Sequence, residues 1–203
     1  MDTIRLAHRS LSRSLAPVRI ECGGAKDAAD ARVNGNYNAR MLALRYVYVL
    51  ALVVWLGGML ILGALVAPTT FEVLQAREPA AGRALAGEVF GSTIARFHYV
   101  AYGAGALLLL TLAAMRLVGP RPAGFGVRAA IAAGMLAIAL YSGFVVLGRI
   151  EAIQREAGDV VSRLSATDAR RLRFDQLHAL STRLMMVNIA AGLVLLYWEA
   201  KES

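Results

Sequence analysis

Four long apolar blocks dominate the pattern of hydrophobic and polar positions along the chain. Each holds close to the ~20 apolar residues that span ~30 Å of hydrocarbon as a helix. A backbone surrounded by lipid must satisfy its own hydrogen bonds, so each block is predicted to be helical. The blocks run from about Tyr46 to Ala67, Phe97 to Val118, Ala129 to Gly148 and His178 to Trp198. The chain is therefore predicted to be an all-α, polytopic membrane protein with four spans.

The connections between the blocks predict an antiparallel four-helix transmembrane bundle. The short turn from Gly119 to Val127 contains Pro120 and Pro122, which break both neighbouring helices and force a tight hairpin. The other two connections, Pro68 to Arg96 and Arg149 to Leu177, are much longer, and both lie on the opposite face of the membrane.

Both long connections are predicted to be partly helical. After the third span, apolar residues recur at helical spacing as far as Leu164, so the third helix is expected to continue through this stretch. Ser165 and Thr167 are both candidates to cap a new helix that leads into the fourth span.

Residues 1–40 differ from the rest of the chain and are predicted to form a disordered basic arm before the transmembrane domain at 41–203. This arm is rich in arginine and serine and contains the turn-prone run Asn34, Gly35, Asn36. Its first 20 residues also have the composition of an organelle transit peptide. Met1 and Met41 are alternative natural starts.

Composition and charge support a membrane protein. The chain is 58% hydrophobic and only 18% charged, which is too apolar for a soluble domain with a polar surface. A net charge of +8 would suggest nucleic acid as a partner of a soluble chain, but the basic residues lie at the edges of the apolar blocks. They are better placed to contact anionic lipid head groups. The bilayer, and not nucleic acid, is the predicted partner.

The cysteine content limits disulfide and metal chemistry, and the charges of the loops indicate how the chain is oriented in the membrane. Cys22 is the single cysteine, which excludes an intramolecular disulfide and a cysteine-based metal site. Arg116, Arg121 and Arg128 lie around the short turn without a neighbouring acid, so both termini are placed in the cytoplasm, with the chain in a bacterial inner (plasma) membrane.

Small residues four positions apart predict close helix packing and a possible homo-oligomer through Gly and Ala helix faces. These pairs are Gly63 with Ala67, Ala101 with Gly105, and Ala139 with Gly143.

Two histidines are the candidate metal or cofactor ligands. His98 and His178 fall at the long-loop ends of their helices, at a similar membrane depth. One hypothesis is that both imidazoles ligate a single metal, such as a b-type haem iron or copper. The favoured interpretation binds no cofactor, with each histidine bonded to a loop or a neighbouring helix.

The fourth helix carries a polar intramembrane stripe that is predicted to point inward. It follows His178 and consists of Ser181, Thr182, Met185 and Asn188. In the favoured interpretation these side chains form hydrogen bonds between helices.

Recognisable catalytic motifs are missing from the sequence. The chain lacks G-x-S-x-G, H-E-x-x-H and a P-loop, and its predicted spans contain no Asp or Glu to carry protons. Gly124, Gly126 and Ala129 match a dinucleotide-binding pattern, but no strand precedes them. We therefore predict no catalytic residue and a non-enzymatic protein.

From about Leu42 to Glu199, the order of these features resembles the transmembrane protein 205-like family. The matching residues include Trp55 to Gly58, Ala67 and Pro68, Phe90, Phe97 and His98, Arg149 to Gly158, and Leu177 to Ser181. This resemblance implies a four-helix membrane domain of largely unknown function. A weaker likeness to copper-resistance D-type proteins and to the membrane-type, haem-dependent protoporphyrinogen oxidase accompanies the haem or copper alternative.

Overall fold

The computed structural model describes the backbone of residues 23–119, 124–157 and 161–202. The chain divides into two units, Met1–Ala39 and Arg40–Ser203. In the first unit the described residues are helical, because α1 (Gly23–Ile61) begins there. The prediction of a disordered arm is therefore wrong for residues 23–39, and residues 1–22 lie outside the described part. Four alanines between Ala25 and Ala31 favour this helix, since alanine has the highest helix propensity.

The second unit contains the four predicted spans, and each is a helix long and apolar enough to cross a membrane. The first span consists of α1 from Arg40, the π-helical segment η1 (Leu62–Val66) and α2 (Ala67–Arg77), and the second is α3 (Gly82–Val118). The third consists of α4 (Phe125–Leu140), the π-helical segment η2 (Tyr141–Leu147) and α5 (Gly148–Ala157). The short 3-10 helix η3 (Val161–Arg163) precedes the fourth, α6 (Ala169–Glu202). The described residues contain no strand, so the all-α membrane fold is confirmed.

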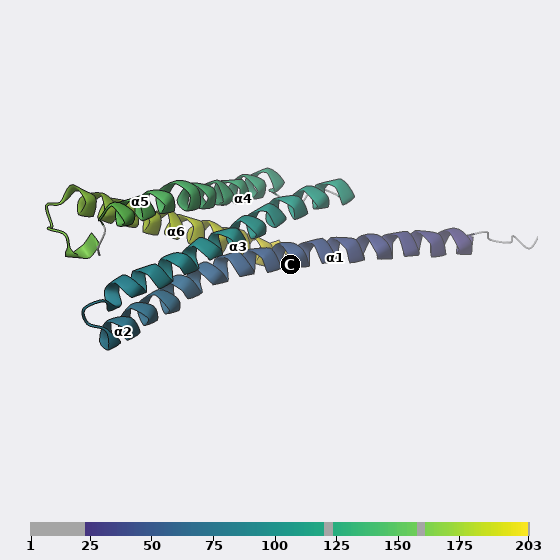
Figure 1. The fold of residues 1–203 in the computed structure, drawn as a ribbon. Helices are drawn as coiled ribbons and strands as arrows, with labels where there is room; N and C mark the ends of the chain where they lie inside the picture. The colour runs from purple at the N-terminus through teal and green to yellow at the C-terminus, as the bar shows by residue number, and fades with distance from the viewer. Residues whose placement is uncertain (1–22, 120–123, 158–160, 203) are drawn as a thin grey trace, which may run out of the picture. The chain divides into compact units, whose positions relative to one another are not determined.

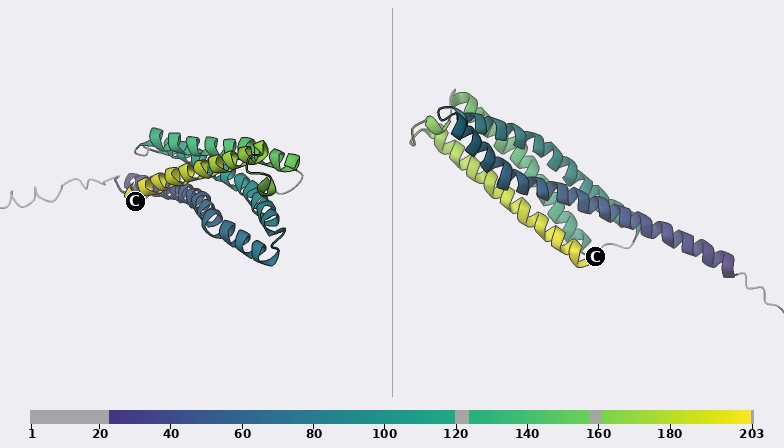
Figure 2. Two further views of the ribbon diagram at one scale, coloured as in Figure 1. Left: turned by 90° about the vertical axis from the view of Figure 1, so that its left-hand side faces the viewer. Right: turned by 90° about the horizontal axis from the view of Figure 1, so that it is seen from below.

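The four spans form two helical hairpins. In the first, α2 is joined to α3 by the turn at Glu78–Ala81, where the Gly82 amide donates a hydrogen bond of 2.6 Å to the carbonyl of Glu78. In the second, α5 is joined to α6 through η3. Both connections lie at the same end of this unit (Figures 1 and 2). The predicted helical character of the long connections is confirmed, since α2, the start of α3 and α5 lie within them.

All four spans contribute to one apolar core. Leu52 and Trp55 from α1, Leu108 from α3, Met135 from α4 and Leu195 from α6 are almost completely buried in it. The backbones approach closely where side chains are small: a Cβ atom added to Gly105 would lie 2.9 Å from Cδ1 of Leu136 and 3.0 Å from Cζ3 of Trp55. Ala101, Gly105 and Ala139, named above for close packing, are therefore used inside the bundle.

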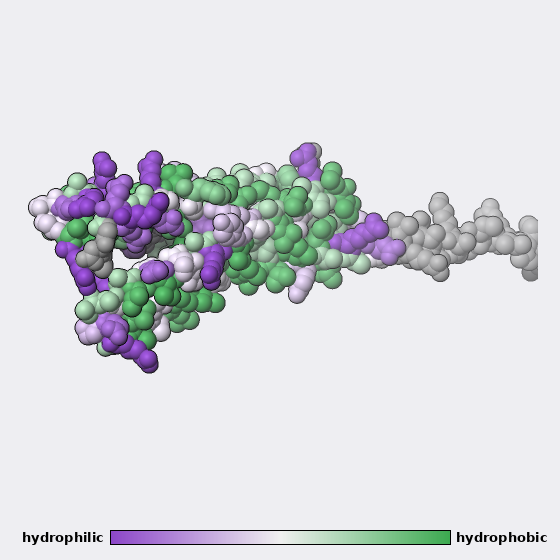
Figure 3. Space-filling model, in the orientation of Figure 1, coloured by the Kyte–Doolittle hydropathy of each residue, from purple (hydrophilic) through white to green (hydrophobic). Residues whose placement is uncertain are grey.

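The outer surface of the helices is apolar. Leu110, Phe144 and Tyr197 are about 70% exposed on α3, η2 and α6. Figure 3 shows apolar residues covering the helices along their middle, while hydrophilic residues gather at the end that carries the long connections. Exposed apolar surface on this scale fits lipid as the solvent of the helices.

The end of α5 and the start of α6 differ from the prediction. Helix α5 ends at Ala157, just before Gly158, and does not continue to Leu164. Asp168, and not Ser165 or Thr167, caps α6: its Oδ1 accepts a 2.8 Å hydrogen bond from the Arg170 amide. The hydroxyl groups of Ser165 and Thr167 instead bond each other at 2.9 Å.

Proline and glycine account for two irregular points in the helices. Pro68 has no N–H to donate to the carbonyl of Ala64, and the π-helical turn η1 ends two residues before it. Gly124 precedes α4 with a φ of 62°, a left-handed conformation that favours glycine. A Cβ atom there would also lie 2.7 Å from Cη2 of Trp198. Gly124 therefore serves the packing of α4 on α6, which accounts for one glycine of the dinucleotide-like pattern.

Candidate functional site

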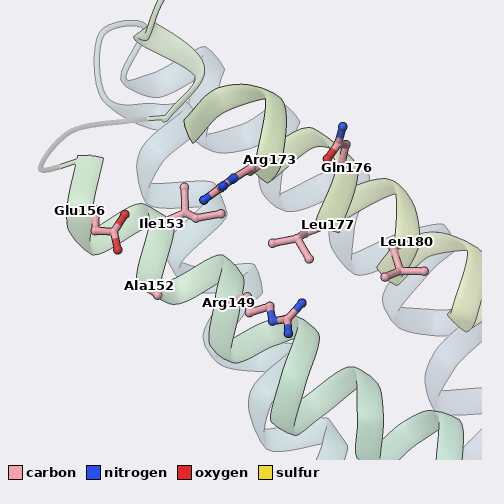
Figure 4. Close-up of a pocket in the computed structure, with 8 residues that line it drawn as sticks. All are labelled: Arg149, Ala152, Ile153, Glu156, Arg173, Gln176, Leu177 and Leu180. Carbon is pink, nitrogen blue, oxygen red and sulfur yellow. The ribbon is translucent and has the colours of Figure 1, made fainter. Parts of the chain in front are cut away.

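A pocket with a volume of about 520 Å³ lies between α5 and α6. Four residues of each helix line it, and Figure 4 shows Arg173 and Leu177 of α6 turned toward α5 across the gap. They are Arg149, Ala152, Ile153 and Glu156 on α5, and Arg173, Gln176, Leu177 and Leu180 on α6.

The pocket combines an apolar floor with two cationic side chains. Ile153 is buried, and Leu177 and Leu180 are partly buried. Arg149 and Arg173 are exposed, and their guanidinium groups extend into the space between the helices (Figure 4). Among the residues that the structure describes, neither arginine has an ion pair or a side-chain hydrogen bond. Two unneutralised cations, one from each helix, therefore share one apolar-floored space.

The sequence places this pocket at the membrane boundary. Arg149 directly follows the predicted third span, which ends at Gly148, and Leu177 directly precedes the fourth, which begins at His178. Leu180 lies inside the fourth span, so the apolar floor continues from the boundary into the hydrocarbon. Arginine is favoured at this depth because its stem packs on apolar groups while its head reaches polar surroundings.

The acidic groups near the pocket already have cationic neighbours. Asp168 accepts hydrogen bonds from Arg170 Nη2 at 2.8 Å and from Arg170 Nε at 3.2 Å. These bonds lower the pKa of Asp168 to about 2, so this carboxylate is ionised at neutral pH. Arg170 also donates to the carbonyl of Glu156 at 3.4 Å and is attracted by the charge of that residue. Arg170 offsets one of these two acids, so the five charged residues, Arg149 and Arg173 included, keep a net charge of +1.

A second charged cluster lies at the opposite end of the bundle. Glu199 of α6 accepts a 2.8 Å hydrogen bond from Nε of Arg45 on α1, and its other carboxylate oxygen accepts one from Nη2 of Arg128 on α4. The side chains of Arg128 and Glu199 are 4% and 7% exposed. The guanidinium of Arg128 also lies 5.1 Å from the ring centroid of Tyr48. This cluster ties three helices together and has a structural role.

Sequence reasoning missed that cluster because Glu199 lies one residue beyond the predicted end of the fourth span. The sequence nevertheless contains a pattern from which the cluster could be predicted. With an even number of crossings between them, the start of the first span and the end of the fourth share one side of the membrane, as does the start of the third. Arg45, Arg128 and Glu199 occupy those three places.

The two candidate ligand histidines lie in different surroundings. His98 is partly buried on α3, and its ring packs beside Tyr102 and against Gly143 of η2. Its Nδ1 lies 2.9 Å from the carbonyl of Ile94, which can only accept, so Nδ1 carries the proton. His178 is exposed and stacks on Phe174, with ring centroids 6.2 Å apart. No ring contact or hydrogen bond joins the two imidazoles, both of which the structure describes.

The polar stripe of the fourth helix divides between two faces. Asn188 is buried, and Ser181 and Met185 are partly buried. Thr182 is exposed on the same face as His178, and its hydroxyl donates a 3.0 Å hydrogen bond to the carbonyl of that residue. Within the described ranges, no group of three or more His, Cys, Asp or Glu side chains is arranged to hold a metal ion.

Comparison with known proteins assigns the chain to a protein family. A family model described as "Domain of unknown function (DUF4149)" matches residues 50–159, which is more than half of the chain. The match begins within α1, ends just after α5 and includes Arg149, whereas α6 lies beyond it. No curated protein and no solved structure matches the chain. The four-span membrane protein described above belongs to the DUF4149 family, whose function is unknown.

Proposed function

We propose that this chain is a non-enzymatic membrane protein that binds an anionic amphiphile in the pocket between α5 and α6. Such a ligand carries a phosphate or carboxylate group on an apolar tail. The observation that carries the proposal is the pair Arg149 and Arg173, which extend from facing helices into one apolar-floored pocket at the membrane boundary.

The residue types suit that ligand. A guanidinium group presents a planar set of donors that matches the oxygens of phosphate or carboxylate. Two unpaired guanidinium groups supply the opposite charge that such an anion needs when it leaves bulk water. Leu177 and Leu180 continue the floor toward the hydrocarbon, where a tail is most stable.

The size of the pocket also supports a small molecule. Its volume of about 520 Å³ lies within the ~300–1,000 Å³ that small-molecule sites usually have. A phosphate group with the first few methylene groups of a tail fits such a volume, while the rest of the tail extends into lipid. We therefore expect recognition of the head group, with tolerance for the length of the tail.

Thermal unfolding of the purified full chain in detergent tests the proposal. Dioleoyl phosphatidate, dioleoyl phosphatidylcholine and inorganic phosphate are added separately. A ligand at 100 times its Kd stabilises by about 2.7 kcal/mol. At about 2–4 °C per kcal/mol for a chain of this size, phosphatidate should raise Tm by roughly 5–10 °C. A rise with inorganic phosphate alone would instead identify a soluble anion as the ligand.

Arg155 supplies the matched control, since it lies on α5 but does not line the pocket. The variant R149Q/R173Q should lose the Tm rise, whereas R155Q should keep it. The proposal fails if phosphatidylcholine raises Tm as much as phosphatidate, or if R155Q loses the response as completely as the double variant. Either outcome would reduce the two pocket arginines to general contacts with the bilayer surface.

The proposal also includes a family resemblance, a host membrane and an orientation of the chain in that membrane. We assign the chain to the transmembrane protein 205-like proteins, on the residues quoted above. We place it in a bacterial inner membrane with both termini in the cytoplasm, which puts the pocket at the outer leaflet. Labelling of Cys22 by an impermeant maleimide in right-side-out and inverted vesicles tests this orientation. Labelling should require inversion, and labelling in right-side-out vesicles would reverse the assignment.

The haem- or copper-binding alternative draws support from one contact. The bond between Nδ1 of His98 and the carbonyl of Ile94 leaves Nε2 with a lone pair, as in many metal-ligating histidines. An optical spectrum of the purified protein tests it. A Soret band, or bound copper, that is lost in H98A and H178A would favour this alternative. A colourless, metal-free preparation from haem- and copper-replete cells would eliminate it.

A further inference from the structure

The two hairpins repeat each other in sequence. At a spacing of 80 residues, positions in the first span match positions in the third, and at a spacing of 87 residues, positions in α3 match positions in α6. The identical pairs at the first spacing include Leu56 and Leu136, Leu60 and Leu140, Gly63 and Gly143, and Val66 and Val146. Those at the second include Arg83 and Arg170, Arg96 and Arg183, Val100 and Val187, Ala104 and Ala191, Gly105 and Gly192, and Leu109 and Leu196.

The ends of the helices follow the same two spacings. Helix α2 ends at Arg77 and α5 ends at Ala157, 80 residues later. Helix α3 begins at Gly82 and α6 begins at Ala169, 87 residues later. The additional residues lie in the second connection, which contains η3. The π-helical segments η1 and η2 also overlap at the first spacing, so each hairpin has its irregular turn at the same point.

Burial repeats as well. At eight pairs of equivalent positions the side chain, or the glycine, is buried in both hairpins although the residue types mostly differ. The buried pairs are Tyr48 and Arg128, Leu52 and Ala132, Trp55 and Met135, Met59 and Ala139, Ala101 and Asn188, Gly105 and Gly192, Leu108 and Leu195, and Leu112 and Glu199. The same face of each helix is therefore turned toward the interior in both hairpins.

The packing contacts of equivalent glycines repeat as well. A Cβ atom on Gly105 would contact Leu136 of the other hairpin and Trp55 of its own, and one on Gly192 would contact Leu56 of the other hairpin and Met135 of its own, the equivalents of those two residues. In the same way, Gly63 faces Met185.

The equivalent of that contact is found in the other half. Gly143 faces His98, which is the position equivalent to Met185, and a Cβ atom there would lie 2.7 Å from Cδ2 of His98. Such reciprocity is the mark of an isologous, two-fold interface.

We infer that residues 45–114 and 125–201 are two copies of one helical hairpin, and that each copy binds the other through the same surface. The membrane domain is thus an internal dimer. Because each copy crosses the bilayer twice, both enter from the same side, and the pseudo-two-fold axis is parallel to the membrane normal. The surface of one hairpin fits a second copy of that hairpin as its partner.

The pocket marks the point where the two copies differ. The positions equivalent to Arg149 and Arg173 are Thr69 and Ala86, and Ala86 is completely buried. Gly82 brings α3 so close to α2 that a Cβ atom would lie 2.8 Å from Cα of Gln75. The first copy is therefore closed where the second holds its pocket.

An exchange of equivalent core residues in the full chain tests the inference. Trp55 packs on Gly105, and Met135 packs on Gly192. W55M leaves a cavity and M135W overfills the core, so each alone should lower Tm by several degrees. W55M/M135W should recover at least half of the summed loss, because the new tryptophan has the equivalent glycine to pack on. The control W55M/L108W adds the ring at a non-equivalent buried position and should show no recovery.

Disulfide cross-linking in membranes gives a second readout that does not depend on those core variants. In a C22S background, a Cβ atom at Gly192 would lie 3.8 Å from Cβ of Leu56, a spacing typical of disulfides. The repeat predicts that L136C/G105C cross-links to within about twofold of L56C/G192C. L56C/G103C is the control, because the space around Gly103 is open. Cross-linking of one equivalent pair alone, or equal recovery in the control exchange, overturns the inference.

Discussion

Replacement of Glu199 by glutamine should destabilise the bundle strongly. Glu199 uses one carboxylate oxygen for Arg45 and the other for Arg128. Glutamine has nearly the same shape but only one acceptor oxygen, so an N–H group would face one of the two guanidinium groups. Because the Arg128 side chain is 4% exposed, its charge would remain buried without the carboxylate. Removing one partner of a buried ion pair costs about 3–5 kcal/mol.

The corresponding change in thermal stability is large enough to measure. At about 2–4 °C per kcal/mol, E199Q should lower Tm by roughly 6–20 °C. Arg45 provides the contrast: its side chain is 37% exposed, and exposed ion pairs contribute about 0–1 kcal/mol. R45Q should therefore lower Tm by no more than about 4 °C. The double variant R128Q/E199Q should be more stable than E199Q, because it buries no uncompensated charge.

Tryptophan fluorescence during heating of the detergent-purified protein is a suitable assay. Trp198 adjoins Glu199 in the sequence and packs on Gly124, so it reports on this end of the bundle. The reasoning would be refuted by a Tm for E199Q within about 2 °C of the parent chain, or by an R45Q variant that loses as much stability as E199Q. The first result would mean that the buried charge of Arg128 does not depend on Glu199, and the second that the partly exposed Arg45 contributes as much stability as the buried pair.

Two further predictions concern packing and pH. Gly143→Ala should lower Tm by several degrees, because its Cβ would collide with Tyr102 and His98. Gly134→Ala, in open space on the same span, should leave Tm unchanged or slightly raised. Equal effects of the two substitutions would contradict the close packing of Gly143. Since Arg170 lowers the pKa of Asp168 from 3.8 to about 2, the stability from this pair is complete above about pH 4 and is lost as the pH falls toward 2. The Tm of Asp168→Asn should fall less steeply over that interval than that of the parent, and parallel curves would show that the pair does not contribute.

The spans could be predicted from sequence because hydrocarbon permits few alternatives. An apolar block of the right length must be a helix, and Pro120 and Pro122 must separate two of them. The hydropathy pattern could also predict that the end of the bundle with the two long connections is hydrophilic. The hydropathy pattern could not choose among neighbouring helix caps, because Ser165, Thr167 and Asp168 are all acceptable residue types. The observed cap, Asp168, accepts hydrogen bonds from both the amide and the guanidinium group of Arg170.

Other features required the pairing of residues that are distant in sequence. The pocket depends on Arg149 and Arg173 extending from two different helices into one space, whereas polar residues within the predicted spans pointed to His98 and His178. The buried position of Glu199 depends on Arg128, which lies 71 residues away. The repeat was accessible in principle, since comparing the chain with itself at a spacing of 87 residues aligns Arg96 with Arg183 and Gly105 with Gly192.

Native mass spectrometry of the full chain, released gently from its own membranes, tests the ligand-binding proposal most directly. The account predicts that the parent protein and R155Q retain one anionic amphiphile per chain, and that R149Q/R173Q releases it while keeping the Tm that the ligand-free parent protein has in detergent. Retention of the same molecule by the double variant, or co-purification of zwitterionic lipid alone with the parent protein, would contradict a binding site between α5 and α6.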